Sequence, residues 1–151
     1  MTSVKLSNNR LSDGVELCNG LQTLLPPPQL QALQLLDLSC NNFTLPGAEA
    51  AALGTLLPGL KALYLHGNAI NEVSGVIALR AAPQLRALTL HGNPLLETQG
   101  RFVRLVVIHA IPQLQRLDFT AVTPAEFERA KILCTKPKAS TRQLHGQKLL
   151  G

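Results

Sequence analysis

The chain has 151 residues, of which 46% are hydrophobic, so it is long enough to form one domain with an apolar core. No uninterrupted apolar stretch reaches about 18 residues, which argues against a transmembrane helix. The three cysteines are far apart and form no CxxC pair, so they predict reduced thiols in a cytosolic compartment and no metal site. The polar N-terminus passes at once into a repeated pattern, so we expect no signal peptide.

The net charge of +5 is concentrated at the C-terminus. Residues 1–134 carry ten basic and nine acidic groups, which argues against a nucleic-acid face on the folded part. Residues 135–151 contain no acid and four basic side chains: Lys136, Lys138, Arg142 and Lys148. We expect this basic tail to be disordered alone and to bind a protein partner, with an acidic surface such as that of tubulin as one candidate. The alternative is a tail that packs on its own domain.

Taken in chain order, the sequence repeats one phrase, LxxLxLxxNxL. A first copy begins at Met1, three full copies occupy residues 33–43, 60–70 and 85–95, and a degenerate copy includes Leu114, Leu117 and Phe119. This is the pattern of a leucine-rich repeat, in which each copy forms one layer of a solenoid. The sequence therefore predicts an α/β leucine-rich repeat solenoid of about five layers.

Within each copy, apolar and polar residues alternate over five positions, which predicts a short strand with one buried face. Neighbouring copies should place these strands side by side in a parallel sheet on the concave face. An asparagine follows each strand, and its amide can bond the backbone groups that the turn leaves unpaired. We expect a ladder of asparagines that ends where Val122 replaces the amide, and its members are Asn9, Asn41, Asn68 and Asn93. The first strand should leave an open sheet edge.

The segments between the strands predict helices on the convex face, at residues 13–25, 46–57, 72–82, 97–111 and 124–134. Pro26, Pro27 and Pro28 should end the first of them, and Pro124 suits the start of the last. Residues 94–134 depart from the plain repeat and predict a C-terminal helical cap that covers the last layer. The expected domains are a leucine-rich repeat domain at 1–134, cap included, and the basic tail at 135–151.

The polar strand positions should line the concave face in rows, since equivalent residues of adjacent layers lie about 5 Å apart. One row should read Lys5, Asp37, Tyr64, Thr89 and Asp118, and the next Ser7, Ser39, His66, His91 and Thr120. Tyr64 should be the only aromatic residue on this face. The partner-binding candidates on the concave face are Lys5, Asp37, Tyr64, His66, Thr89, His91, Arg116 and Asp118.

Two chemical interpretations of the histidines, a metal site and a catalytic triad, are less well supported than a role in a binding surface. His66 and His91 could bind zinc, but a third ligand is missing if Asp118 lies in the other row. Ser39, His66 and Asp37 could suggest a catalytic triad, but a flat sheet offers no pocket and no oxyanion donor. We therefore expect no catalytic residue, no metal, no cofactor and no small-molecule substrate.

Repeats of this type with this cap resemble the cytosolic class that includes the protein phosphatase 1 regulators and the U2 spliceosomal A-prime protein. The runs LKALYLHGN at Leu60–Asn68 and LRALTLHGNP at Leu85–Pro94 resemble more closely the leucine-rich repeat-containing protein 51 family. So do the opening LSNNRLSD, the later LDFTAVT and the element Lys136-Pro137-Lys138. We expect two departures from that family's pattern: a start at the first repeat without an N-terminal extension, and a proline-rich spacer at 26–34.

The resemblance implies a small non-enzymatic component of the cilium or flagellum, built into the axoneme. The leading hypothesis is therefore a structural adaptor in the cytoplasm that binds axonemal proteins, with no nucleic acid and no membrane as partner. Two other functions remain open at this point. One is a regulatory subunit that docks a protein phosphatase catalytic subunit on the concave face. The other is a scaffold in a ribonucleoprotein particle.

Overall fold

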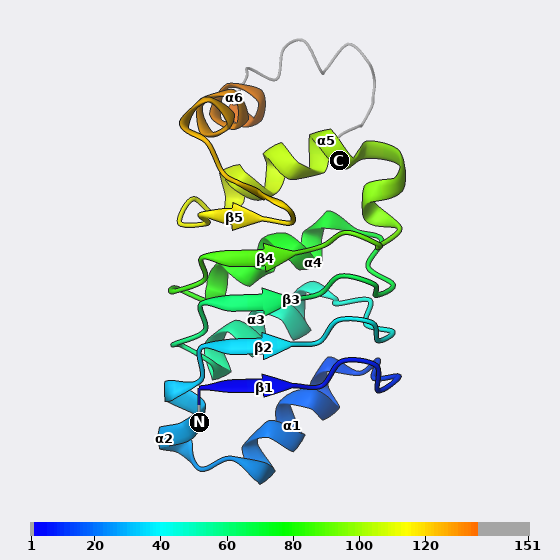
Figure 1. The fold of residues 1–151 in the computed structure, drawn as a ribbon, viewed down its shortest axis with the longest axis vertical. Helices are drawn as coiled ribbons and strands as arrows, with labels where there is room; N and C mark the ends of the chain where they lie inside the picture. Colours follow the sequence, from blue (N-terminus) through cyan, green and yellow to red (C-terminus); the bar gives the residue numbers. More distant parts are fainter. Residues whose placement is uncertain (1, 136–151) are drawn as a thin grey trace.

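The computed structural model describes residues 2–135, which form a stack of strands with helices along one side (Figure 1). Six strands make one sheet in chain order: β1 (Ser3–Lys5), β2 (Leu35–Asp37), β3 (Ala62–Tyr64), β4 (Ala87–Thr89), β5 (Arg116–Leu117) and β6 (Thr120–Ala121). The first five are parallel, and β6 pairs antiparallel with β5. The predicted fold class, a solenoid of five layers, is confirmed.

The helices follow the strands and cover one face of the sheet: α1 (Gly14–Leu24), α2 (Pro27–Ala32), α3 (Gly47–Leu56), α4 (Val73–Ile77) with the 3₁₀ turn η1 (Ala78–Ala81), α5 (Leu95–Ala110) and α6 (Pro124–Thr135). Five were expected near these positions. The sequence does not predict the short α2, because the three prolines indicate only the end of α1. Pro27 instead begins a helix, since the first turn does not need the N–H that proline lacks. No helix within residues 2–135 is both long and apolar enough to cross a bilayer.

The core is a column of leucines from equivalent positions of the layers. Leu36, Leu63 and Leu88 come from the strand centres and are fully buried, because each lies between two neighbouring layers. The first layer is less well covered, and its Val4, Leu6 and Leu11 are only partly buried. The helix-facing side of the sheet therefore holds the apolar contacts, and the other side stays available to solvent.

The asparagines that follow the strands join each layer to the layer before it. Asn93 donates from Nδ2 to the carbonyls of Leu65 and Leu90, at 2.9 and 2.8 Å, and its Oδ1 accepts the Ile70 N–H. Asn68 and Asn41 make the same kinds of bond one and two layers earlier, and all three side chains are buried. Asn9 is exposed and its side chain bonds only carbonyls of its own turn.

The turn before each asparagine uses the left-handed backbone region. Gly67 and Gly92 have φ of 72° and 76° in the two His-Gly-Asn corners, where glycine has no Cβ to clash. Cys40 occupies the same corner of the second layer with φ 57°. The backbone conformation at these corners therefore favours glycine, which is more than a neutral residue of the repeat.

Helices α5 and α6 pack on each other and close the far end of the stack (Figure 1). The Arg104 guanidinium binds both carboxylate oxygens of Glu126, at 2.6 and 3.1 Å, and donates to the carbonyl of Leu117. Glu126 also accepts the Thr123 N–H, while its own N–H donates to the Thr123 hydroxyl, which is a capping box at the start of α6. One ion pair thus ties α5, the last strands and α6 together.

Candidate functional site

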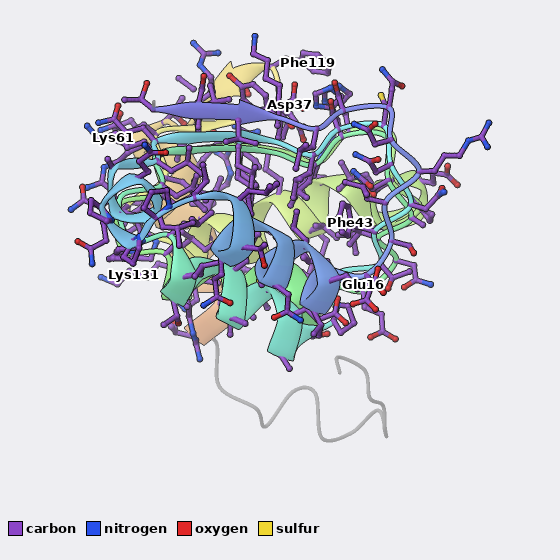
Figure 2. The ribbon with its side chains drawn as sticks, turned by 90° about the horizontal axis from the view of Figure 1, so that it is seen from below. Glu16, Asp37, Phe43, Lys61, Phe119 and Lys131 are labelled. Carbon is purple, nitrogen blue, oxygen red and sulfur yellow. The ribbon has the colours of Figure 1, made fainter. Side chains whose placement is uncertain are left out.

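The sheet face turned away from the helices, called the concave face here, carries the side chains that the sequence singled out. Figure 2 shows Asp37 and Phe119 on this face, with Glu16 and Lys131 on the helical side. The strand register places Lys5, Asp37, Tyr64 and Thr89 in one row, as the repeat predicted. Lys5 is exposed, and the other three are partly buried.

The fifth layer breaks both predicted rows. Asp118 has φ 57°, so the chain leaves the strand path there and turns back as the hairpin β5–β6. Asp118 therefore does not continue the row of Thr89, and Thr120 pairs with Leu117 instead of continuing the row of His91. An aspartate tolerates this left-handed conformation better than most residues do.

The consequence is an aromatic ridge along the concave face, formed by Tyr64, His66, His91 and Phe119. The His66 and His91 rings stack with centroids 4.5 Å apart and planes 9° apart, and the Phe119 ring lies 4.5 Å from that of His91. The ring centroid of Tyr64 lies 6.3 Å from that of His66. The expectation that Tyr64 is the only aromatic residue here is wrong. Phe119, expected at a buried leucine position, is 75% exposed because the turn at Asp118 reverses the alternation.

Hydrogen bonds hold both imidazoles in place. Asp118 Oδ1 lies 3.0 Å from His91 Nδ1, and because a carboxylate only accepts, His91 donates from Nδ1. The same oxygen accepts the N–H groups of Leu90 and His91. His66 Nδ1 lies 2.8 Å from the Thr89 hydroxyl oxygen, which also accepts the Leu65 N–H, so a hydrogen bond joins the two side chains.

The environment of His66 disfavours its charged form. Partial burial lowers the pKa of His66, and the neighbouring His91 lowers it further, while Asp37 and Asp118 oppose both effects. These effects together favour the neutral form of the His66 ring.

The structure does not assemble the catalytic triad considered from the sequence. Ser39 is buried and donates directly to Asp37 at 2.6 Å, while His66 bonds to Thr89. The idea that Asp118 is remote from the histidines is also wrong, since it contacts His91. Even so, no group of three His, Cys, Asp or Glu side chains within the described residues could hold a metal ion.

The remaining predicted contacts divide into two groups. Arg116 is exposed at the fifth layer, where its guanidinium lies 3.4 Å from the Phe119 carbonyl, and so it borders the ridge. The tail residues lie outside the part of the chain that the structure describes: Lys136, Lys138, Arg142 and Lys148. Sequence reasoning missed Phe119, although the aspartate before it was the available signal for a turn.

Comparison with known proteins identifies the family. A leucine-rich repeat family model matches residues 11–144. Leucine-rich repeat-containing protein 51 of Bos taurus is 37% identical over 139 residues, which cover 90% of this chain and 68% of that protein. The chain belongs to the leucine-rich repeat-containing protein 51 family. The proteins of that name from Rattus norvegicus and Mus musculus match over the same shares at 36% identity.

The chain is also similar to leucine-rich repeat proteins outside this family. The U2 small nuclear ribonucleoprotein A′ of Schizosaccharomyces pombe is 36% identical over 104 residues, which cover 69% of this chain and 41% of that protein. The crystal structure of the Drosophila melanogaster SNF/U2A′ complex matches with a TM-score of 0.69 over 97% of this chain and 75% of that one, at 22% identity. The leucine-rich repeat domain of Chaetomium thermophilum Mex67 matches with a TM-score of 0.64 over 84% and 87%.

The family and the fold both indicate a general role in protein interaction. Leucine-rich repeats are protein-interaction scaffolds, because a stack of layers presents a continuous surface. The concave face of this chain has the features of such a surface: exposed aromatic side chains, fixed imidazoles and charges of both signs.

Proposed function

We propose that this protein is a non-enzymatic structural adaptor that binds a protein partner through the aromatic ridge of its concave face. The observation that carries the proposal is Phe119, a large apolar side chain that is 75% exposed at the end of a stack of fixed rings. Aromatic residues with rigid neighbours are the usual energetic centres of protein interfaces, because they bury a large area at a small entropic cost.

The chemistry of the ridge points to the kind of contact. His66 and His91 are held by hydrogen bonds, so they would lose little freedom on binding. Charges of both signs border the rings, since Asp37 pairs with Tyr64 in the strand register and Arg116 lies against the Phe119 carbonyl. Lys5 lies one strand beyond Asp37. We infer that the partner presents an apolar side chain to Phe119 and polar groups around it, as one face of a helix or a loop would do.

The cellular setting that we propose is the ciliary or flagellar axoneme, in line with what the family resemblance implies. An adaptor in such an assembly should stay with the cytoskeleton after detergent extraction and a salt wash. We expect a tagged copy in a ciliated cell to remain in the axonemal pellet, and crosslinking mass spectrometry to join Lys5 to one neighbouring protein.

The ridge is tested by one change and its matched control. Phe119→Ala should release most of the tagged protein into the soluble fraction, with about a ten-fold or greater loss of affinity for the crosslinked partner, because an interface aromatic commonly contributes 2 kcal/mol or more, by rough estimate. Leu24→Ala removes an equally exposed apolar side chain, 79% exposed, from α1, and should change nothing. Equal retention of both variants would rule out the ridge as the contact.

A second candidate function is supported by the 36% identity to the U2 small nuclear ribonucleoprotein A′. By analogy the chain would be a protein scaffold in a ribonucleoprotein particle. The same fractionation separates the two, since that role places the tagged protein in a soluble particle that contains RNA. Co-purification with a phosphatase catalytic subunit would instead favour a regulatory subunit.

A further inference from the structure

A groove in the cap has no part in the ridge or in the proposed function. It lies between α5 and α6, has a volume of about 500 Å³, and is lined by Gly100, Arg101, Arg104, Leu105, Glu126 and Arg129. Half of these residues are arginines from two different helices. The groove is therefore a concentration of positive charge in a domain that is otherwise close to neutral.

One of the three arginines is already neutralised. Arg104 forms the ion pair with Glu126 and also donates to the Leu117 and Ala121 carbonyls, so its charge and its donors are engaged. Glu126 is the only acid that lines the groove. Its pKa is lowered mainly by the hydrogen bond from Arg104 and slightly by the nearby charge of Arg129.

The other two arginines keep their charge available. Arg101 and Arg129 are exposed, and among residues 2–135 the structure records an ion pair to neither of them. Glu97 lies one turn before Arg101 on α5 and Glu128 precedes Arg129 on α6, but neither forms an ion pair with these guanidinium groups. Two positive charges that form no ion pair with any described residue thus face one groove from opposite helices.

The walls of the groove favour a compact ligand. Gly100 lies beside the arginines and leaves open space, since a side chain there would meet only Leu96 Cβ at 3.9 Å. Leu105 adds an apolar wall. We propose that this groove binds a phosphorylated serine or threonine side chain of a partner protein.

Three arguments select this ligand over other anions. A phosphate monoester carries about −1.5 to −2 charges at neutral pH, which matches two guanidinium groups, whereas one carboxylate would leave a guanidinium unmatched. A nucleic acid needs a track of basic residues along its backbone, and residues 1–134 carry only one excess positive charge. A membrane surface needs a broad basic face for the same reason.

The test uses small probes, so that it does not depend on an unknown peptide sequence. The ¹⁵N-labelled chain is titrated with N-acetyl-O-phosphoserine amide and, separately, with N-acetylglutamate amide, and the backbone and arginine Nε–H signals are followed by NMR. We expect phosphoserine to shift the signals of Gly100, Arg101 and Arg129 in a saturable way. Glutamate should need about a ten-fold higher concentration to reach the same shifts, because it carries one charge fewer.

Matched variants decide whether the groove is responsible. Arg101→Gln with Arg129→Gln should weaken phosphoserine binding by about ten-fold or more, since each charged pair lost in a partly exposed site costs about a factor of three to five. Arg10→Gln with Arg80→Gln removes two exposed arginines elsewhere and should leave the affinity unchanged. Unchanged ¹H–¹⁵N spectra away from the substitutions establish that the variants are folded.

Three outcomes would overturn the proposal. The first is the absence of saturable shifts at the groove with phosphoserine. The second is equal affinity for phosphoserine and glutamate, or an equal loss of phosphoserine affinity in the Arg101/Arg129 and Arg10/Arg80 double variants. The third is a decauridine RNA or a phosphatidylserine vesicle that shifts the groove signals while phosphoserine does not, which would make the groove a nucleic-acid or lipid site. None of these results bears on the ridge, because the two sites share no residue.

Discussion

At the scale of single residues, the asparagine after each strand has the largest structural effect for its size. Asn93 is fully buried, and its one amide group satisfies two carbonyls and one N–H from two neighbouring layers. Water cannot replace these bonds, because the site is closed by the layers on both sides. Asn9 makes bonds of a similar length at the exposed first turn, where water can replace them.

We therefore predict unequal costs for the same substitution at equivalent positions. Asn93→Ala should lower the free energy of unfolding by about 2–4 kcal/mol, because it leaves buried backbone groups without partners. Asn9→Ala should cost less than about 1 kcal/mol, since its partners are hydrated. Urea denaturation followed by circular dichroism measures both values. Similar costs for the two variants would show that burial does not decide the contribution of the amide.

The exposed ring of Phe119 shows how one residue can redirect the residues around it. The positive φ of Asp118 ends the parallel strand, so the next side chain points out of the sheet instead of into the core. The Asp118 carboxylate then binds His91 and fixes the ring on which Phe119 packs. The turn and the ridge are thus products of the same residue.

At the scale of elements, the cap depends on the contact between α5 and α6. The ion pair of Arg104 and Glu126 is largely shielded from water, and it also holds the start of α6 through Thr123. The Arg104 hydrogen bond is the main cause of the lowered pKa of Glu126, since it stabilises the ionised carboxylate. The cap should consequently weaken in acid.

The sign of this pH dependence follows from proton binding. The unfolded chain protonates Glu126 near its ordinary pKa of 4.5, and the folded chain does so only at lower pH. The contribution to stability is therefore complete above pH 4.5 and is lost as the pH falls through the lowered pKa. Glu126→Gln should cost about 1.5–3 kcal/mol at pH 7, the range for a hydrogen bond to a charged group.

The measurement is the free energy of unfolding of both proteins from pH 7 to pH 3. The difference between them should shrink below pH 4.5. Glu128→Gln on the same helix is the control, because Glu128 is exposed and forms no ion pair with any described residue. If the difference in the free energy of unfolding stays constant down to pH 3, the effect of Glu126→Gln comes from the shape of the side chain and not from its charge.

At the scale of the whole molecule, the sequence determines the parts that repeat and leaves open the parts that occur once. The leucine and asparagine positions predict the sheet, its register in the first four layers and the buried column, because each layer imposes the same constraint on the next. The hairpin at Asp118 and the short α2 occur once, so the periodicity of the sequence does not predict them. The groove of Arg101 and Arg129 depends on how two helices pack, which their separate sequences do not reveal.

The stack also predicts a gradient of stability along the chain. Leu6 and Leu65 occupy the same position of the repeated phrase, but Leu65 is 0% exposed between two layers while Leu6 is partly exposed in the first. In a solenoid each layer is stabilised by its neighbours, so a change in the middle weakens two interfaces and a change at the end weakens one. Leu65→Ala should cost about 3–5 kcal/mol, and Leu6→Ala about 1–2 kcal/mol.

Chemical denaturation and hydrogen exchange together test this gradient. Leu65→Ala should lower the denaturation midpoint much more than Leu6→Ala does. Leu6→Ala should accelerate exchange mainly in β1 and α1, because the first layer can open while the others stay folded. If both variants lose the same stability and exchange rises uniformly, the five layers unfold as a single cooperative unit. The partial cover of the first layer would then have no energetic consequence, because its opening would require the opening of β2, β3 and β4 as well.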